Sequence, residues 1–120
     1  MDIWSELPAV QAEYAPPPPG APSPMKWGTE DGLRELFGPA PSITIHPRTF
    51  RSRFATVDRY LSTLLPTYSP FVRLAQRIGR DAFNGFAQDL AELVARWHEA
   101  DDGSFVLPMT YVVAVVDTPA

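Results

Sequence analysis

Residues 42–54 read SITIHPRTFRSRF. Polar and apolar side chains alternate from Ser42 to His46, and β-branched residues are frequent, which is typical of a β-strand. The pattern continues after Pro47, and a strand tolerates proline at a sheet edge or at a bulge. We therefore expect one long strand over residues 42–54, bent or bulged at Pro47.

A second strand is expected near the C-terminus, over residues 110–116, which read TYVVAVV. This run is almost continuously apolar and β-branched, as in strands that are covered on both faces. If it pairs only with residues 42–54, its other edge keeps free backbone donors and acceptors, which are a template for association. The run therefore predicts either a homodimer or a partner that supplies a further strand.

Three helices are expected between the two strands. Thr56 caps the first, which ends at Pro66, and Ser69 followed by Pro70 is a favoured opening for the second. The third, over residues 81–100, has an apolar stripe at helical spacing. The stripe consists of Phe83, Phe86, Ala87, Leu90, Leu93, Val94 and Trp97. Together these patterns predict an α+β fold, in which an antiparallel strand pair is covered by three to four helices.

The first 27 residues are expected to form a separate proline-rich segment. The chain has 14 prolines, more than twice the usual share of about 5%, and six of them lie within residues 15–24. Such a run favours an extended polyproline strap, and Pro8 is expected to limit a short helix over residues 3–14 to one side. Because the segment offers little apolar area to a core, removal of residues 1–24 is predicted to leave the domain of residues 28–120 folded and cooperative.

A short helix is expected between the strap and the first strand. Thr29 can cap it, and Gly38 followed by Pro39 can end it. Trp27, just before the cap, is expected to anchor the strap to the core.

Composition and charge exclude several classes of function. The chain has 14 acidic and 10 basic side chains, a formal net charge of −4, which argues against nucleic acid or an anionic membrane as the main partner. The absence of cysteine excludes disulfides, thiolate zinc sites and cysteine nucleophiles. The longest apolar run is far shorter than a membrane span, and the start Met1-Asp2 does not resemble a signal peptide. A cytoplasmic protein is expected.

No catalytic, cofactor-binding or metal-binding residue can be assigned from the sequence. A dinucleotide or adenosylmethionine loop needs glycines one or two positions apart, and the glycines here are never closer than Gly28 and Gly32. His46 and His98 lie on different expected elements without metal-ligand spacing. Asp101 and Asp102 adjoin Gly103, so a role in a turn is favoured over acid–base chemistry.

Five residues are candidates for contacts with a substrate. They are Trp27, His46, Arg48, Arg51 and Tyr111. Arg51 and Arg53 point to one face of the expected strand, where they can hold an anionic group. The favoured alternative is pairing with Asp58, Asp102 or a carboxylate of a helix.

A series of short motifs follows one another from about Tyr14 to Val116. They are PPPPG (16–20), WGTE (27–30), LRELFG (33–38), SIT (42–44), PRTF (47–50) and ADDG (100–103), together with Tyr68, Pro70, Pro108 and Tyr111. In this order they resemble the second half of bacterial class I S-adenosylmethionine-dependent methyltransferases.

The resemblance implies a place in a larger fold. Such methyltransferases have a doubly wound sheet that ends in an antiparallel hairpin, which makes residues 42–54 its sixth strand and residues 110–116 its seventh, beside the fifth. The first five strands, the glycine-rich loop and the acidic residue for the cofactor ribose are not in this chain. The resemblance therefore implies a C-terminal, substrate-side portion, truncated or one subunit of a split enzyme. Such a portion neither binds S-adenosylmethionine nor catalyses methyl transfer alone.

Two kinds of partner follow, a separate cofactor-binding half or a second copy, together with a small-molecule methyl acceptor. The alternative is a small-ligand-binding or oligomerisation module without catalytic activity. Its ligand would lie between the sheet and the aromatic side chains Phe83, Phe86 and Trp97.

Overall fold

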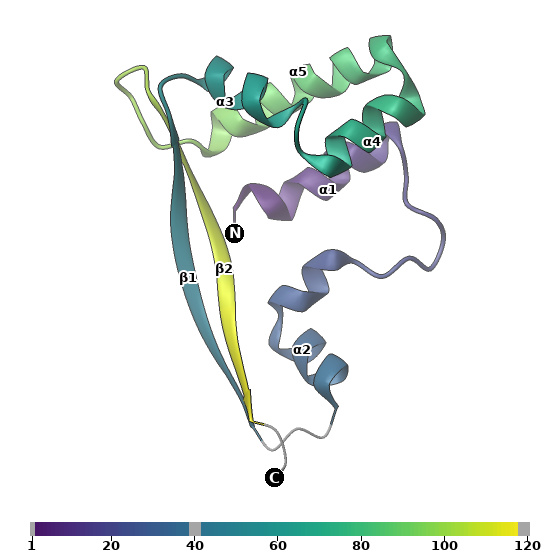
Figure 1. Cartoon of the computed structure of the whole chain (residues 1–120), viewed down its shortest axis with the longest axis vertical. Coiled ribbons are helices and arrows are strands. Elements are labelled where there is room, and N and C mark those ends of the chain that lie inside the picture. The colour runs from purple at the N-terminus through teal and green to yellow at the C-terminus, as the bar shows by residue number, and fades with distance from the viewer. Residues whose placement is uncertain (1, 39–41, 118–120) are drawn as a thin grey trace. The chain divides into compact units, whose positions relative to one another are not determined.

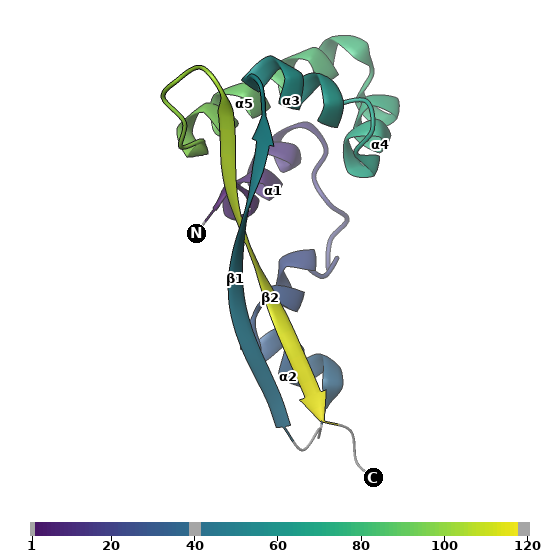
Figure 2. The same cartoon turned by 60° about the vertical axis from the view of Figure 1, so that its left-hand side comes forward.

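The computed structural model describes residues 2–38 and 42–117. In chain order these residues form α1 (Ile3–Tyr14), the 3-10 turn η1 (Pro24–Gly28), α2 (Glu30–Phe37), β1 (Ser42–Phe54), α3 (Val57–Leu64), α4 (Ser69–Ile78), α5 (Arg80–Trp97) and β2 (Phe105–Asp117). The two strands run in opposite directions and form one two-stranded sheet (Figures 1 and 2). The predicted α+β class with an antiparallel strand pair is confirmed.

The chain divides into two compact units. The helical unit comprises residues 2–17 and 51–109, and the second unit comprises residues 18–38, 42–50 and 110–117 among those described. Both strands contribute to both units. The expected boundary at residue 27 does not coincide with this division. Helix α1 belongs to the helical unit, whereas residues 42–50 of β1 and residues 110–117 of β2 belong to the second unit.

The core of the helical unit is built mainly on α5, whose 18 residues place an apolar stripe against the other helices and β2. The largest fully buried side chains are Phe71, Phe86, Phe105, Leu90, Leu93, Leu107 and Val94. The rings of Phe71 and Phe86 meet edge to face with centroids 5.1 Å apart, an arrangement that aromatic quadrupoles favour. The predicted stripe over residues 81–100 therefore faces the core, although the helix ends at Trp97.

The N-terminal segment does not behave as the proline count predicts. Helix α1 runs unbroken through Pro8, and Asp2 caps it by accepting a hydrogen bond from the backbone N–H of Trp4. Ile3 and Leu7 are only 2% and 3% exposed. Burial of these two side chains offsets the hydrogen bond that Pro8 cannot donate. The expectation that residues 1–24 contribute little to the core is wrong.

Of the caps expected between the strands, that of Thr56 is confirmed, whereas Ser69 does not cap α4: it is the first helical residue, and Tyr68 before it makes no side-chain cap. The Thr56 hydroxyl accepts from the N–H of Arg59 at the start of α3, and Pro70 lies in the first turn of α4. After α5, Gly103 adopts a φ of 88°. A left-handed conformation of this kind is accessible to glycine without strain, so the expected turn forms before β2.

Strand β2 is longer than predicted, because it begins at Phe105 and not at residue 110. Phe105, Leu107 and Met109 alternate into the core. Pro108 lies between them, where a two-stranded sheet tolerates it because each strand has a free edge. Local sequence alone treats that proline as a stop.

The expectation that residues 110–116 are covered on both faces is wrong for the described part of the chain. Val113 and Val115 are 44% and 51% exposed, and Tyr111 is exposed as well. Their neighbours Val112 and Ala114 are half-buried. A continuous apolar run indicates a strand suited to cover on both faces, but residues 2–38 and 42–117 supply no third strand beside it.

In the second unit, side chains join the paired strand ends. Ser42 donates a hydrogen bond to the carboxylate of Asp117, and the rings of Phe50 and Tyr111 lie with centroids 6.0 Å apart. Thr29 caps α2 and Gly38, with a φ of 65°, follows it, as the sequence predicts, while Pro39 lies outside the described residues. None of the helices formed by the described residues combines the length and the hydrophobicity that crossing a bilayer requires.

Candidate functional site

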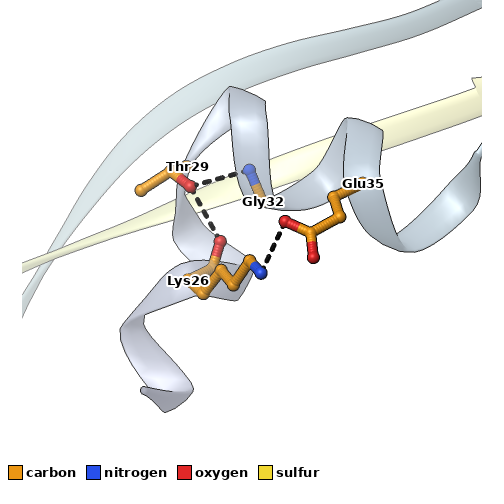
Figure 3. A network of polar contacts seen from close by, with 4 residues as sticks. All are labelled: Lys26, Thr29, Gly32 and Glu35. Atoms are coloured by element: carbon orange, nitrogen blue, oxygen red, sulfur yellow. Dashed lines mark hydrogen bonds and ion pairs between the residues drawn. The ribbon is translucent and has the colours of Figure 1, made fainter. Parts of the chain in front are cut away.

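The segment from the 3-10 turn η1 to α2 is tied together by one threonine. The Thr29 hydroxyl accepts a hydrogen bond from the N–H of Gly32 at 3.0 Å and donates one to the carbonyl of Lys26 at 2.9 Å. Figure 3 shows both bonds converging on this side chain. The hydroxyl thereby satisfies one free donor at the start of α2, and its bond to the Lys26 carbonyl adds to the one that this carbonyl accepts from the N–H of Thr29. The angle between the two short elements is fixed by these bonds.

Gly32 allows the two elements to approach closely. A Cβ atom added at this position would lie 2.0 Å from the carbonyl oxygen of Lys26 and 2.6 Å from its Cγ. Both distances are far below van der Waals contact, and the first involves backbone. Only glycine fits here without displacing η1.

A pocket of about 380 Å³ lies beside the close contact between η1 and α2. It is lined by Pro22, Lys26, Trp27, Gly32, Glu35 and Leu36, all from the second unit. Trp27 is 60% exposed, so its ring forms a wall of the pocket. The expectation that Trp27 anchors the strap to the core is wrong. An accessible indole face stacks well on flat apolar groups and on cations.

An ion pair crosses the lining of the pocket. The Nζ atom of Lys26 lies 2.5 Å from a carboxylate oxygen of Glu35, as Figure 3 shows. Both side chains are exposed, and pairs of this kind stabilise a protein by about 0–1 kcal/mol. The pair therefore matters more as a polar recognition element, because it offers a donor and an acceptor beside the apolar wall.

The arrangement supports binding more than catalysis. Apolar walls formed by Trp27, Leu36 and Pro22 can hold a flat or aromatic body, and Lys26 and Glu35 can orient one polar group on it. This combination is typical of small-molecule sites.

Three other candidates belong to the second unit but do not line the pocket. His46 is half-buried on β1. Arg48 is exposed and donates to the carbonyl of Pro47 at 2.9 Å. Tyr111 contacts the ring of Phe50. Of the five residues, Trp27 is the one the pocket includes.

Arg51 belongs to the helical unit and already has a partner. Its Nε donates to a carboxylate oxygen of Glu99 at 3.0 Å, just after α5. Arg51 thus pairs with a carboxylate, as the favoured alternative expects, although Glu99 lies two residues beyond the end of α5 and not within the helix. Asp102 accepts from the N–H and the hydroxyl of Ser104, and the Ser104 hydroxyl, followed by its N–H, lowers the pKa of Asp102. This is turn chemistry, as the adjacent Gly103 predicts.

The space proposed for a ligand beside α5 is occupied by the chain itself. Phe86 is fully buried, and its ring contacts the rings of Phe71, Tyr14 and Phe83. Tyr14 donates a hydrogen bond to Asp89. This bond, followed by burial, raises the pKa of Tyr14 to about 12. Burial also raises the pKa of Tyr60 to about 12. These aromatic side chains serve packing.

Sequence reasoning missed five lining residues, which are Pro22, Lys26, Gly32, Glu35 and Leu36. One signal was available, because glycine near the middle of a short helix is unfavourable and often marks a close approach of backbone. Gly32 lies three residues after Thr29, and its backbone N–H donates the hydrogen bond that the capping hydroxyl of Thr29 accepts. No comparable signal distinguishes Lys26 or Glu35 from other surface charges.

Within residues 2–38 and 42–117, no group of three or more histidine or carboxylate side chains is placed to hold a metal ion. A scan against models of protein families finds no match to this chain, and a search of curated proteins likewise finds no match.

Proposed function

We propose that this chain is the C-terminal, substrate-side portion of an S-adenosylmethionine-dependent methyltransferase and that a separate chain supplies the cofactor-binding half. The proposal rests on the motif order given above. The element order is consistent with it, since β1 and β2 are antiparallel and three helices lie between them in the chain.

The structural observation that supports a separate second half is the exposure of β2 beyond Met109. Tyr111, Val113 and Val115 are exposed on a strand that pairs, among the described residues, with β1 alone. Exposed β-branched residues beside a free edge suit the addition of a further strand. In the proposed complex that strand comes from the cofactor-binding half.

The division of labour follows from the residues present. The partner binds S-adenosylmethionine through its own glycine-rich loop. This chain contributes the pocket at Trp27, which holds the apolar body of the methyl acceptor, while Lys26 and Glu35 orient its polar group. By itself the chain transfers no methyl group.

The test uses, as a candidate partner, a protein encoded beside this one and chosen because its sequence carries a glycine-rich loop after a strand. The two purified chains are mixed, and S-adenosylmethionine binding is measured by calorimetry for each chain and for the mixture. We expect no binding by this chain alone, micromolar binding by the mixture, and loss of complex formation with Val115→Lys. Micromolar binding by this chain alone, or a mixture that forms no complex, would contradict the proposal.

A second candidate function is a ligand-binding module without catalysis that forms a homodimer. The observation in its favour is that one chain supplies every residue lining the pocket, so binding there needs no second half. Sedimentation distinguishes the two proposals. A homodimer that binds aromatic compounds without any cofactor-binding partner would favour the module.

A further inference from the structure

A second pocket, of about 230 Å³, lies in the helical unit between α1 and α4. It is lined by Gln11, Ala15, Pro70, Arg73, Leu74 and Arg77. Helix α4 contributes most of the lining. Arg73 and Arg77 are spaced by one helical turn, so their side chains lie on the same face of that helix.

Arg73 and Arg77 belong to the exposed arginines that have no ion pair among the described residues, a group that also includes Arg53, Arg59 and Arg80. Arg34, Arg51 and Arg96 each pair with a glutamate, whereas Arg73 and Arg77 have neither an ion pair nor a hydrogen bond with residues 2–38 or 42–117. Two like charges one turn apart also destabilise a helix. An anion held between them would relieve this repulsion.

The sequence around α4 concentrates positive charge in an otherwise acidic chain. Residues 59–80 contain four arginines and no aspartate or glutamate, although the chain as a whole carries a net charge of −4. A local excess of this kind attracts anions to the surface over about the Debye length, roughly 8 Å at physiological salt. The side of the pocket formed by α4 lies within this excess, whereas α1, which forms the other side, carries Glu6 and Glu13 and no basic residue.

The floor of the pocket is apolar. Leu74 is 7% exposed, and Pro70 and Ala15 flank it. Gln11 adds an amide that can donate or accept. The site thus combines two unpaired guanidinium groups with a small apolar surface.

We propose that this pocket binds a small organic phosphate. The guanidinium groups of Arg73 and Arg77 hold the phosphate, and Leu74 with Pro70 contacts a short apolar body. A phosphate monoester carries close to two negative charges at neutral pH, which matches two unpaired cations better than one carboxylate does. Guanidinium also binds phosphate oxygens in a bidentate manner. This inference is independent of the methyltransferase proposal.

The test titrates phenyl phosphate into the full chain and follows backbone amides by nuclear magnetic resonance. We expect saturable binding, with the largest shifts on α4 and near Gln11. Arg73→Gln and Arg77→Gln should each weaken it by about tenfold, as loss of a charge-assisted contact does. The matched control is Arg80→Gln, which removes the same charge from an exposed arginine that does not line the pocket.

Three results would overturn the proposal. The first is equal weakening by Arg80→Gln, which would indicate attraction to general positive charge. The second is equal affinity for benzoate or for inorganic phosphate, which would remove the assignment to an organic phosphate. The third is the absence of saturable binding at about 10 mM phenyl phosphate, a concentration that detects even millimolar affinity. Thermal unfolding of each variant, unchanged from wild type, confirms that the fold is intact.

Discussion

The two units of this chain differ in where their apolar side chains lie. The helical unit buries a continuous cluster of aliphatic and aromatic residues, whereas Leu33 is the one buried hydrophobic side chain among the described residues of the second unit. Among the described residues, the large hydrophobic side chains that stay exposed all belong to that second unit: Met25, Trp27, Leu36, Phe37, Phe50, Tyr111, Val113 and Val115.

This contrast separates two sources of order. Burial of apolar area orders the helical unit, while the second unit relies on strand pairing and on side-chain caps such as that of Thr29. A unit with little core and much exposed apolar surface is suited to binding. We therefore expect core substitutions in the helical unit to affect stability and surface substitutions in the second unit to affect association and ligand binding.

The sharpest test of the contrast compares two phenylalanines. Phe86→Ala removes a fully buried ring and is expected to lower the free energy of unfolding by about 3–5 kcal/mol. Phe50→Ala removes an exposed ring and should change it by about 0.5 kcal/mol or less. Urea unfolding of both variants measures the difference, and similar losses would mean that the two units share one core.

Leu7→Ala tests whether α1 belongs to the core of the helical unit. Because Leu7 is buried, we expect a loss of about 2–4 kcal/mol in the free energy of unfolding. Leu36→Ala, at an exposed leucine of the second unit, is the matched control and should cost much less. If Leu7→Ala unfolds like wild type, the N-terminal segment is dispensable after all.

Gly32→Ala tests the local order of the second unit. The added Cβ would meet the carbonyl of Lys26, so we expect a destabilisation of about 1–3 kcal/mol, typical of overpacking, and a displaced Trp27. Gly28→Ala is the control, because nothing lies within 4 Å of a Cβ there. Heat unfolding and binding of aromatic compounds are the two readouts. Equal unfolding temperatures and equal binding for the two variants would contradict the close approach of Gly32 to the carbonyl of Lys26.

Val113→Lys and Val115→Lys probe the exposed part of β2. Since both valines are about half exposed, the free energy of unfolding of the monomer should change by about 0.5 kcal/mol or less. Association should nevertheless weaken strongly, because a seam there would bury an unpaired charge. Sedimentation velocity measures this, with Thr44→Lys on β1 as control. A wild-type chain that stays monomeric at high micromolar concentration and also forms no complex with the cofactor-binding chain would contradict the prediction.

The smallest effect concerns the turn before β2. The hydrogen bonds from Ser104 lower the pKa of Asp102 below its usual value of 3.8. A lowered pKa in the folded state stabilises the protein above the usual value, and this contribution disappears as pH falls through the folded-state pKa. Unfolding measured between pH 6 and pH 2 should therefore lose slightly less stability in Asp102→Asn than in wild type. A larger acid loss in Asp102→Asn would be the opposite result.

Much of the fold follows from local signals in the sequence. The caps of Thr29 and Thr56 place α2 and α3, and the apolar stripe places α5, because these signals act within one or two turns. The alternation of residues 42–54 likewise predicts β1. The position of each of these elements depends on residues close to it in the sequence.

The errors have a common physical cause in long-range packing. Pro8 and Pro108 indicate breaks locally, but burial of Leu7 and of Leu107 in the core keeps helix and strand intact. For the site, the sequence identifies Trp27 but not its exposure, and it leaves several partners open for Arg51. The methyltransferase assignment stays a prediction, since it rests on motif order.

The amine of Lys26, which pairs with Glu35 in the lining of the pocket, can be labelled chemically. Lys26 is the one lysine among 120 residues, so an acylating reagent has a single side-chain amine to modify. The other amine is at the N-terminus and is distinguished by mass after proteolysis. A molecule seated against Trp27 would shield the Lys26 amine and slow its acylation. The rate of labelling at this one atom thus reads out occupancy, and candidate acceptors can be screened by mass spectrometry without a cofactor, a partner or an enzymatic assay.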